Sequence, residues 1–192
     1  MIVRNTFIGL LALGLSGCGA VVVGGAATGI AVAHDRRTTG TVIEDQEIFL
    51  RAIKLRSENE ELKQKTNINV DVYNMQVLLT GQAENMEIVE RYRDRLMQIP
   101  RVRTVFNEVT VGAESTWGEA TADTYLTSKV KVALFNVKLP GFDPTRVKVT
   151  SSLGTVYLMG LLSPTEADAV TEEVRFVSGV TRVVKLFEYI GQ

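Results

Sequence analysis

The sequence has only one cysteine, one histidine and one tryptophan in 192 residues. A single cysteine cannot close a disulfide within the chain, and one Cys and one His fall short of the ligands that a structural zinc site needs. The 21 basic side chains are outnumbered by 22 acidic ones. Because phosphate neutralisation requires a clear surplus of Lys and Arg, we expect no nucleic-acid partner.

Groups for catalysis are also missing. The only histidine, His34, lies in a polar stretch, "HDRRTTGT", and the pairs Glu60-Glu61 and Glu172-Glu173 fall on polar helix faces where charges are normally solvated. No glycine-rich phosphate loop follows a strand, and no nucleophile elbow is present. The sequence therefore predicts a protein that is not an enzyme, with no catalytic residue, no metal site and no cofactor.

What is present at the N-terminus is a short apolar run ending at the sole cysteine. Arg4 precedes "TFIGLLALGL" at residues 6–15, and "LSGC" ends in Cys18. The run is too short to span a bilayer, which takes about 20 residues. It resembles a bacterial lipoprotein signal, which implies a signal peptide at residues 1–17 and fatty acyl chains such as palmitate on Cys18. Two or more such chains anchor a protein stably to a membrane.

Two other readings of this region remain open. Cys18 can be an ordinary buried cysteine, or the uncharged stretch between Arg4 and His34 can be one transmembrane helix interrupted by glycines. The mass of the mature chain distinguishes them. Under the lipoprotein reading, residues 18–43 form a lipidated cysteine and a flexible tether. Gly19 is not the aspartate that commonly retains lipoproteins at the inner membrane, so the resemblance implies an outer-membrane lipoprotein facing the periplasm.

The rest of the chain is an internal repeat. "INVDVYNMQVLLTGQ" from Ile68 aligns with "VKVTSSLGTVYLMGL" from Val147, and "VRTVFNEV" from Val102 aligns with "VTRVVKLF" from Val180. Apolar periodicity predicts the order helix, strand, strand, helix, strand in each copy. The fold class is therefore α+β, with two tandem domains at residues 44–112 and 123–192 and a linker at residues 113–122. Each domain is expected to be a small mixed three-stranded sheet covered by two helices.

Turn and cap signals refine the pattern. Hairpin turns are predicted at residues 74–76 and 151–154, and "SPTE" at residues 163–166 predicts a capping box with proline in the first turn. Upstream, Asp45 and Asp123 occupy equivalent places in the two opening helices.

In its order of motifs, the repeat resembles the BON domain. The features are a strand ending in "VLLTG" or "VYLMG", then a helix, then a short closing strand. Two copies behind a lipoprotein signal resemble the dual-BON outer-membrane lipoproteins of Gram-negative bacteria. The resemblance implies binding of anionic, phosphatidylglycerol-like phospholipid through the second domain, with roles in envelope integrity, cell division and stress response.

In that family the opening helix of the second domain contacts lipid, and the matching stretch is residues 123–138. Its apolar residues form two stripes, one more than a small domain needs to bury. The first stripe consists of Leu126, Val130, Ala133 and Val137, and the second of Tyr125, Ser128, Val132 and Phe135. Lys129, Lys131 and Lys138 border the second stripe. Such an arrangement is typical of a surface that lies at anionic headgroups. The predicted lipid-binding residues are Trp117, Tyr125, Ser128, Lys129, Val132 and Phe135.

Two alternatives stay open at this stage. The second stripe can be a wide core face packed against the sheet and the other domain, and Trp117 can be a packing wedge between the copies. In function, the rival is a periplasmic adaptor that docks onto outer-membrane assembly or division proteins without recognising lipid.

Overall fold

The structure, a computed structural model, describes residues 35–112 and 117–191. The signal peptide, Cys18, the transmembrane alternative and the first part of the tether lie outside these residues. The chain divides into the units Met1–Ala33 and His34–Gln192, and all described residues belong to the second. Within the described part of the chain, no helix combines the length and the apolar character needed to cross a membrane.

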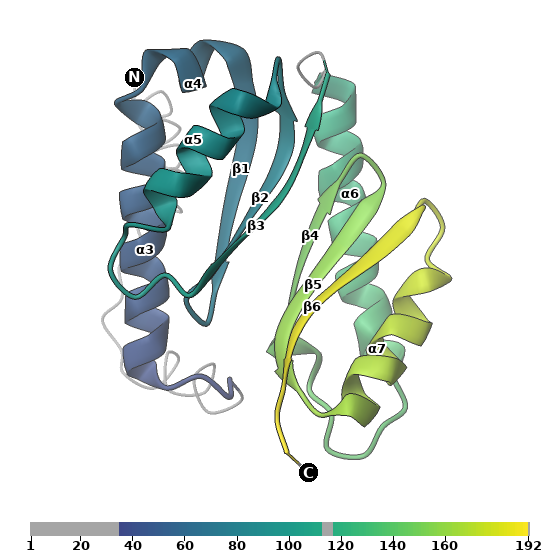
Figure 1. The fold of residues 1–192 in the computed structure, drawn as a ribbon. Coiled ribbons are helices and arrows are strands. Elements are labelled where there is room, and N and C mark those ends of the chain that lie inside the picture. The colour runs from purple at the N-terminus through teal and green to yellow at the C-terminus, as the bar shows by residue number, and fades with distance from the viewer. Residues whose placement is uncertain (1–34, 113–116, 192) are drawn as a thin grey trace, which may run out of the picture. The chain divides into compact units, whose positions relative to one another are not determined.

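The predicted order of elements is confirmed in both copies (Figure 1). The first domain consists of α3 (Thr39–Ser57), α4 (Glu60–Lys65), β1 (Thr66–Tyr73), β2 (Gln76–Ala83), α5 (Met86–Leu96) and β3 (Thr104–Val111). The second consists of α6 (Trp117–Ala133), 3₁₀ turns at Leu134–Asn136 and Pro144–Arg146, β4 (Val147–Ser152), β5 (Thr155–Leu162), α7 (Pro164–Arg175) and β6 (Arg182–Tyr189).

Each sheet is three-stranded and mixed, as expected. The orders are β1-β2-β3 and β4-β5-β6, with an antiparallel hairpin followed by a parallel third strand. The parallel pairing arises because α5 and α7 cross over between the second and third strands. Helix α7 begins with the predicted capping box, in which Ser163 and Glu166 satisfy each other's backbone N–H groups. The fold class predicted from the repeat is confirmed.

Three boundaries differ from the expectation. Helix α3 begins at Thr39 rather than at residue 44, because the Thr38 hydroxyl accepts the Thr41 N–H and caps the helix. The last residues of the expected tether therefore belong to the fold. Helix α6 begins at Trp117, inside the expected linker, and ends at Ala133. The short α4 was not predicted, although Asn59 caps it and two glutamates follow in its first turn.

Both hairpins turn through two residues with positive φ, the type I′ geometry that matches the twist of paired strands. The φ values are 50° and 62° at Asn74 and Met75, and 50° and 74° at Leu153 and Gly154. Only the last of these four is a glycine, so the other three residues adopt a conformation that L-residues disfavour.

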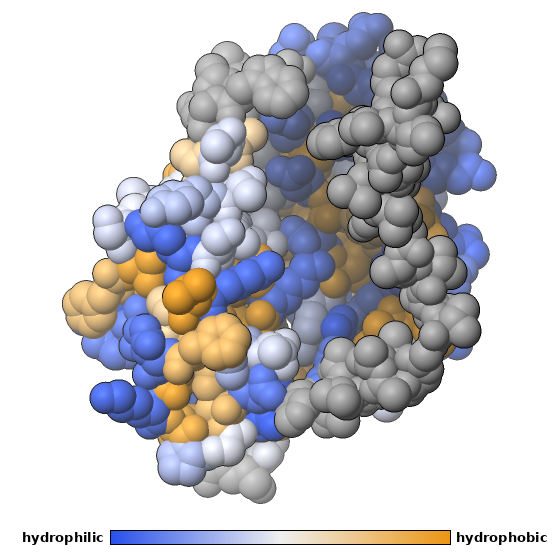
Figure 2. Space-filling model, turned by 180° about the vertical axis from the view of Figure 1, so that it is seen from behind, coloured by the Kyte–Doolittle hydropathy of each residue, from blue (hydrophilic) through white to orange (hydrophobic). Residues whose placement is uncertain are grey.

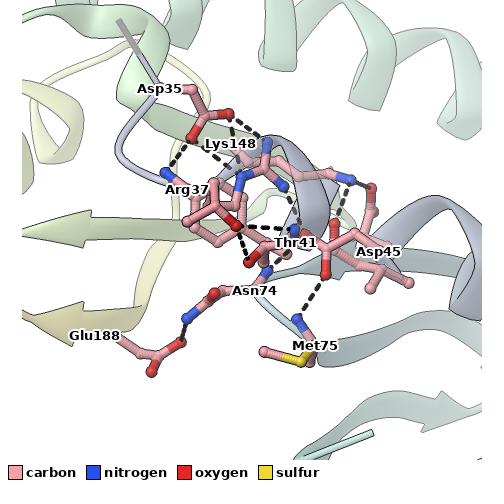
Figure 3. A network of polar contacts seen from close by, with 12 residues as sticks. Asp35, Arg37, Thr41, Asp45, Asn74, Met75, Lys148 and Glu188 are labelled. Carbon is pink, nitrogen blue, oxygen red and sulfur yellow. Dashed lines mark hydrogen bonds and ion pairs between the residues drawn. The ribbon is translucent and has the colours of Figure 1, made fainter. Parts of the chain in front are cut away.

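The opening helix of each domain holds its turn through one aspartate. Asp45 accepts the N–H groups of Asn74 and Met75 at 2.7 and 2.6 Å (Figure 3). Asp123 occupies the equivalent place and accepts the Leu153 N–H at 3.0 Å and the Gly154 N–H at 3.4 Å. The repeated aspartates therefore link each opening helix to its hairpin.

Replacing Asp123 by Ala is expected to lower the free energy of unfolding of the His34–Gln192 fragment by about 1–2 kcal/mol, because two turn N–H groups lose a charged acceptor. Urea unfolding followed by circular dichroism measures this change. Asp168 is an exposed carboxylate on α7, so Asp168→Ala serves as the control and should stay within about 0.5 kcal/mol of wild type. Equal stability of the two variants would contradict the proposed role of Asp123.

The sheets bury both of their faces. One face of each packs under its own helices, with Val77 and Leu79 in the first core and Val156 and Leu158 in the second. The opposite faces form a shared cluster that consists of Tyr73, Leu78, Tyr157, Met159 and Leu186. Ion pairs surround this cluster, namely Lys148–Asp71, Arg103–Glu188 and Arg182–Glu108. The helices consequently lie on the outer faces, as Figure 1 shows.

Candidate functional site

Helix α6 buries one of its two apolar stripes against the second sheet. Leu126, Val130 and Leu134 are buried in the core of the second domain. The expected stripe named Ala133 and Val137 in place of Leu134, and both of these are half-buried. The difference arises because the α-helix ends at Ala133 and tightens into a 3₁₀ turn, which changes the spacing of the inward positions.

The second stripe of α6 is exposed. The side chains of Tyr125, Val132 and Phe135 are 67%, 68% and 73% accessible to solvent, and we call these three residues the apolar strip. Ser128 is also exposed, and its hydroxyl donates to the Thr124 carbonyl at 3.0 Å. Figure 2 shows apolar side chains interspersed with hydrophilic ones over this face. Three large apolar side chains on one exposed face are unusual for a surface that meets only water.

The lysines at the edges of the strip differ in their surroundings. The Lys129 ammonium donates to the Ser178 carbonyl and lies 5.5 Å from the centroid of the Tyr125 ring. Lys129 therefore connects α6 to the loop after α7 as well as adding positive charge. Lys131 and Lys138 are exposed, and among the described residues neither has a carboxylate partner. These two lysines are available to an external anion.

The end of α7 extends this surface in a way that the sequence did not predict. Phe176 is 70% exposed, and the Arg175 guanidinium lies 4.5 Å from the centroid of its ring. Phe135 and Lys138, which follow the end of α6, line a shallow hollow together with Glu173 of α7. The end of α7 therefore lies beside the strip. The signal was present in the sequence as an aromatic residue next to an arginine, outside the apolar stripe of α7.

Two predicted site residues are not tested by this geometry. Cys18 lies outside the described residues. Trp117 is the first residue of α6, but its side chain also falls outside what the structure describes. The assignment of Trp117 to lipid contact or to packing remains a prediction.

Residues 35–38, which we call the entry segment, lead into α3 and contact both domains. Arg36 donates to both carboxylate oxygens of Glu166, at 2.6 and 2.8 Å, and to the Leu161 carbonyl at 2.8 Å. Arg37 donates to Asp45 at 2.7 Å and stacks 4.1 Å from the centroid of the Tyr73 ring. The entry segment is thus fixed to α7 on one side and to α3 on the other.

The Glu166 carboxyl is strongly stabilised in its charged form. Burial alone would raise the pKa of Glu166, but hydrogen bonds from Arg36 and from the Ser163 N–H lower it to about 2, from an ordinary value of 4.5. Glu166 therefore remains a carboxylate throughout the physiological pH range.

The described residues contain no group of three or more His, Cys, Asp and Glu side chains placed to hold a metal ion. What the exposed face of α6 offers is an apolar strip with ammonium groups at its edge that have no carboxylate partner within residues 35–112 and 117–191. Such a surface binds by burying area and by attracting negative charge.

The repeated mixed sheets and the helices over them define the class of protein. A family model described as the BON domain matches residues 51–113 and 122–191. The chain belongs to the BON domain family and contains two copies of that domain.

Two curated proteins resemble the chain over most of its length. It is 34% identical over 179 residues to the outer membrane lipoprotein DolP of Haemophilus influenzae, covering 92% of this chain and 90% of that protein. It is also 34% identical over 157 residues to a 21 kDa hemolysin of Actinobacillus pleuropneumoniae, covering 81% of this chain and 79% of that protein.

Solved structures give a more distant match. The C-terminal domain of CdsD, the structural protein of the type III secretion system of Chlamydia trachomatis, aligns with 77% of this chain and 67% of its own. The sequence identity is 16% and the TM-score is 0.29, and no conclusion about this chain rests on that match.

Proposed function

We propose that this protein is an outer-membrane lipoprotein that binds anionic phospholipid on the periplasmic side through α6 of its second BON domain. Its role is non-enzymatic and serves envelope integrity, with a link to cell division. The single observation that carries the lipid proposal is the exposure of Tyr125, Val132 and Phe135 beside lysines that have no carboxylate partner in the described part of the chain. The name of the Haemophilus relative and the "LSGC" signal at Cys18 support the lipoprotein assignment.

The expected affinity of the strip alone is modest. Fully burying one large apolar side chain contributes about 1.5–3 kcal/mol, and shallow insertion into an interface contributes only part of this. Each lysine close to an anionic surface adds about 1 kcal/mol. The strip therefore gives weak, reversible binding that favours negatively charged headgroups.

Anchoring at Cys18 makes weak binding sufficient. Only 16 residues lie between Cys18 and Asp35, where the described fold begins. A chain of that length spans at most about 55 Å when fully extended. An acylated protein thus keeps the strip near the membrane surface at an effective concentration in the millimolar range.

The test uses the His34–Gln192 fragment, which has no lipidation site. It is expected to float with vesicles that contain phosphatidylglycerol, to bind more as the phosphatidylglycerol fraction rises, and to be released by added salt, which screens the lysines. Vesicles of phosphatidylcholine alone are the control. If the fragment does not float, or if its binding does not depend on the phosphatidylglycerol fraction, the recognition of anionic lipid is contradicted. The alternative function, an adaptor for outer-membrane assembly or division proteins, is then favoured.

A further inference from the structure

A groove of about 810 Å³ lies between helix α3 of the first domain and helix α6 of the second. Val42, Gln46 and Phe49 of α3 line one wall, and Lys131 of α6 and Phe135 of the 3₁₀ turn that follows it line the other. The volume falls within the range of about 300–1,000 Å³ that is typical of sites for small molecules. The groove therefore has room for more than a single ion.

The groove is continuous with the lipid-contact surface. Phe135 belongs to the apolar strip and also lines the groove, and Lys131 borders both. A molecule held in a membrane under the strip would accordingly meet the mouth of the groove.

The walls of the groove are amphiphilic. Apolar side chains from both domains alternate with polar ones such as Gln46 and Thr145. Neither a bare anion nor a pure hydrocarbon chain satisfies such a lining, because one leaves apolar surface uncovered and the other leaves polar groups without partners. The lining matches a ligand that has both a polar and an apolar part.

The charged residues that line the groove are paired in its less exposed part and unbalanced at its mouth. We call the less exposed charged residues of the lining its floor, and they form two ion pairs: Arg37 pairs with Asp45 at 2.7 Å (Figure 3), and Lys148 pairs with Asp71 at 2.9 Å. The fifth charged residue of the lining, Lys131, has no carboxylate partner among the described residues. The unbalanced positive charge therefore lies at the mouth, beside Phe135.

We propose that this groove receives the headgroup of one anionic phospholipid drawn from the membrane under the strip. Its phosphodiester lies at Lys131, the remainder of the headgroup extends toward the polar floor, and the acyl chains stay on the side of Phe135. This inference rests on the proposed lipid binding and goes beyond it, because it gives the first BON domain a part in selecting the headgroup through α3.

The test compares two tryptophan substitutions on α3 of the His34–Gln192 fragment. Gln46→Trp places a bulky ring in the groove, whereas Leu50→Trp lies on an exposed part of α3 that does not line the groove. The probe is dihexanoyl phosphatidylglycerol below its micelle concentration, followed by amide chemical shifts. Dihexanoyl phosphatidylcholine and inorganic phosphate are the comparison ligands.

The short-chain phosphatidylglycerol is expected to shift amides of residues 42–49 and 131–135 in the wild-type fragment. Gln46→Trp should weaken this binding by about tenfold through steric exclusion, and Leu50→Trp should leave it unchanged. Phosphatidylcholine should bind more weakly, because Lys131 then meets a headgroup with no net charge. Inorganic phosphate should bind much more weakly, since it cannot cover the apolar walls.

The groove assignment and the lipid contact of the strip can be contradicted independently of each other. If the wild-type fragment floats with anionic vesicles but α3 amides do not shift, or if the two tryptophan variants bind equally, the groove assignment is wrong and the strip stands. If α3 amides shift but the fragment does not float, the strip is wrong and the groove stands. If inorganic phosphate gives the same shifts at the same affinity, the site is one for anions and not for lipid.

Discussion

A Val132→Asp variant of the His34–Gln192 fragment is expected to bind anionic vesicles roughly thirtyfold more weakly than wild type while unfolding at the same temperature. The substitution removes an apolar side chain from the middle of the exposed strip and adds a negative charge that anionic headgroups repel. Together these effects cost about 2 kcal/mol of binding free energy. Flotation over a series of lipid concentrations measures the loss.

Val111→Asp is the matched control for this change. Val111 is similarly exposed but lies at the end of β3 in the first domain. The control should bind like wild type, apart from the small effect of one added charge. Tyr125→Ala, which shortens the strip without adding charge, should weaken binding less than Val132→Asp does. A lower unfolding temperature in Val132→Asp would show that the substitution disturbs the fold, and the loss of binding would then not report contact between the strip and lipid.

An Arg36→Ala variant is expected to lose about 2 kcal/mol of stability, which lowers the unfolding temperature by about 4–8 °C. Among the residues that the structure describes, the change leaves the buried Glu166 carboxylate with the Arg146 guanidinium, at 3.3 Å, as its one charged partner. Removing one partner of a fully buried pair costs about 3–5 kcal/mol, but the Arg36 side chain is 27% exposed and solvent screens part of the interaction. Differential scanning calorimetry measures the shift.

The same pair makes stability depend on pH in a defined direction. The pKa of Glu166 is depressed to about 2 in the folded state, so its contribution is fully present above the ordinary value of 4.5 and is lost as pH falls toward 2. Because Arg36→Ala removes the main cause of that depression, the gap in stability between wild type and variant should narrow from pH 7 to pH 2.5.

Arg95→Ala removes an exposed arginine at the end of α5 and should leave both stability and its pH dependence unchanged. Urea unfolding at constant ionic strength is the measurement. A stability gap that stays constant over this pH range would show that Arg36 acts through packing and not through Glu166.

The helices, strands and turns of this fold could be predicted from the sequence. Alternating valines, the "SPTE" cap and the repeat at a spacing of 79 residues were enough to predict two mixed sheets with their helices. The alternating valines and the cap depend on residues close together in the chain, and the repeat shows the same local pattern twice. The equivalence of Asp45 and Asp123 was also visible, but its reason, the holding of a strained turn by a helix carboxylate, required coordinates.

The contacts between distant residues could not be predicted. Arg36 meets Glu166 across 130 positions, and in the sequence it appeared only as part of a polar tether. The groove between α3 and α6 likewise depends on how the two domains pack against each other, which no periodicity encodes. Helical spacing did separate the two stripes of α6, but only burial could show that Leu126 faces the core while Phe135 faces solvent.

The entry segment determines how a mechanical load would reach the two domains. Arg36 is held by α7 and β5, and the adjacent Arg37 is held by α3 and the Tyr73 ring. Tension applied to the chain at Asp35 would be shared at neighbouring residues between α7 and β5 of the second domain and α3 of the first, instead of peeling α3 away first. A pull on the chain at its entry into the fold would thus displace the two domains together.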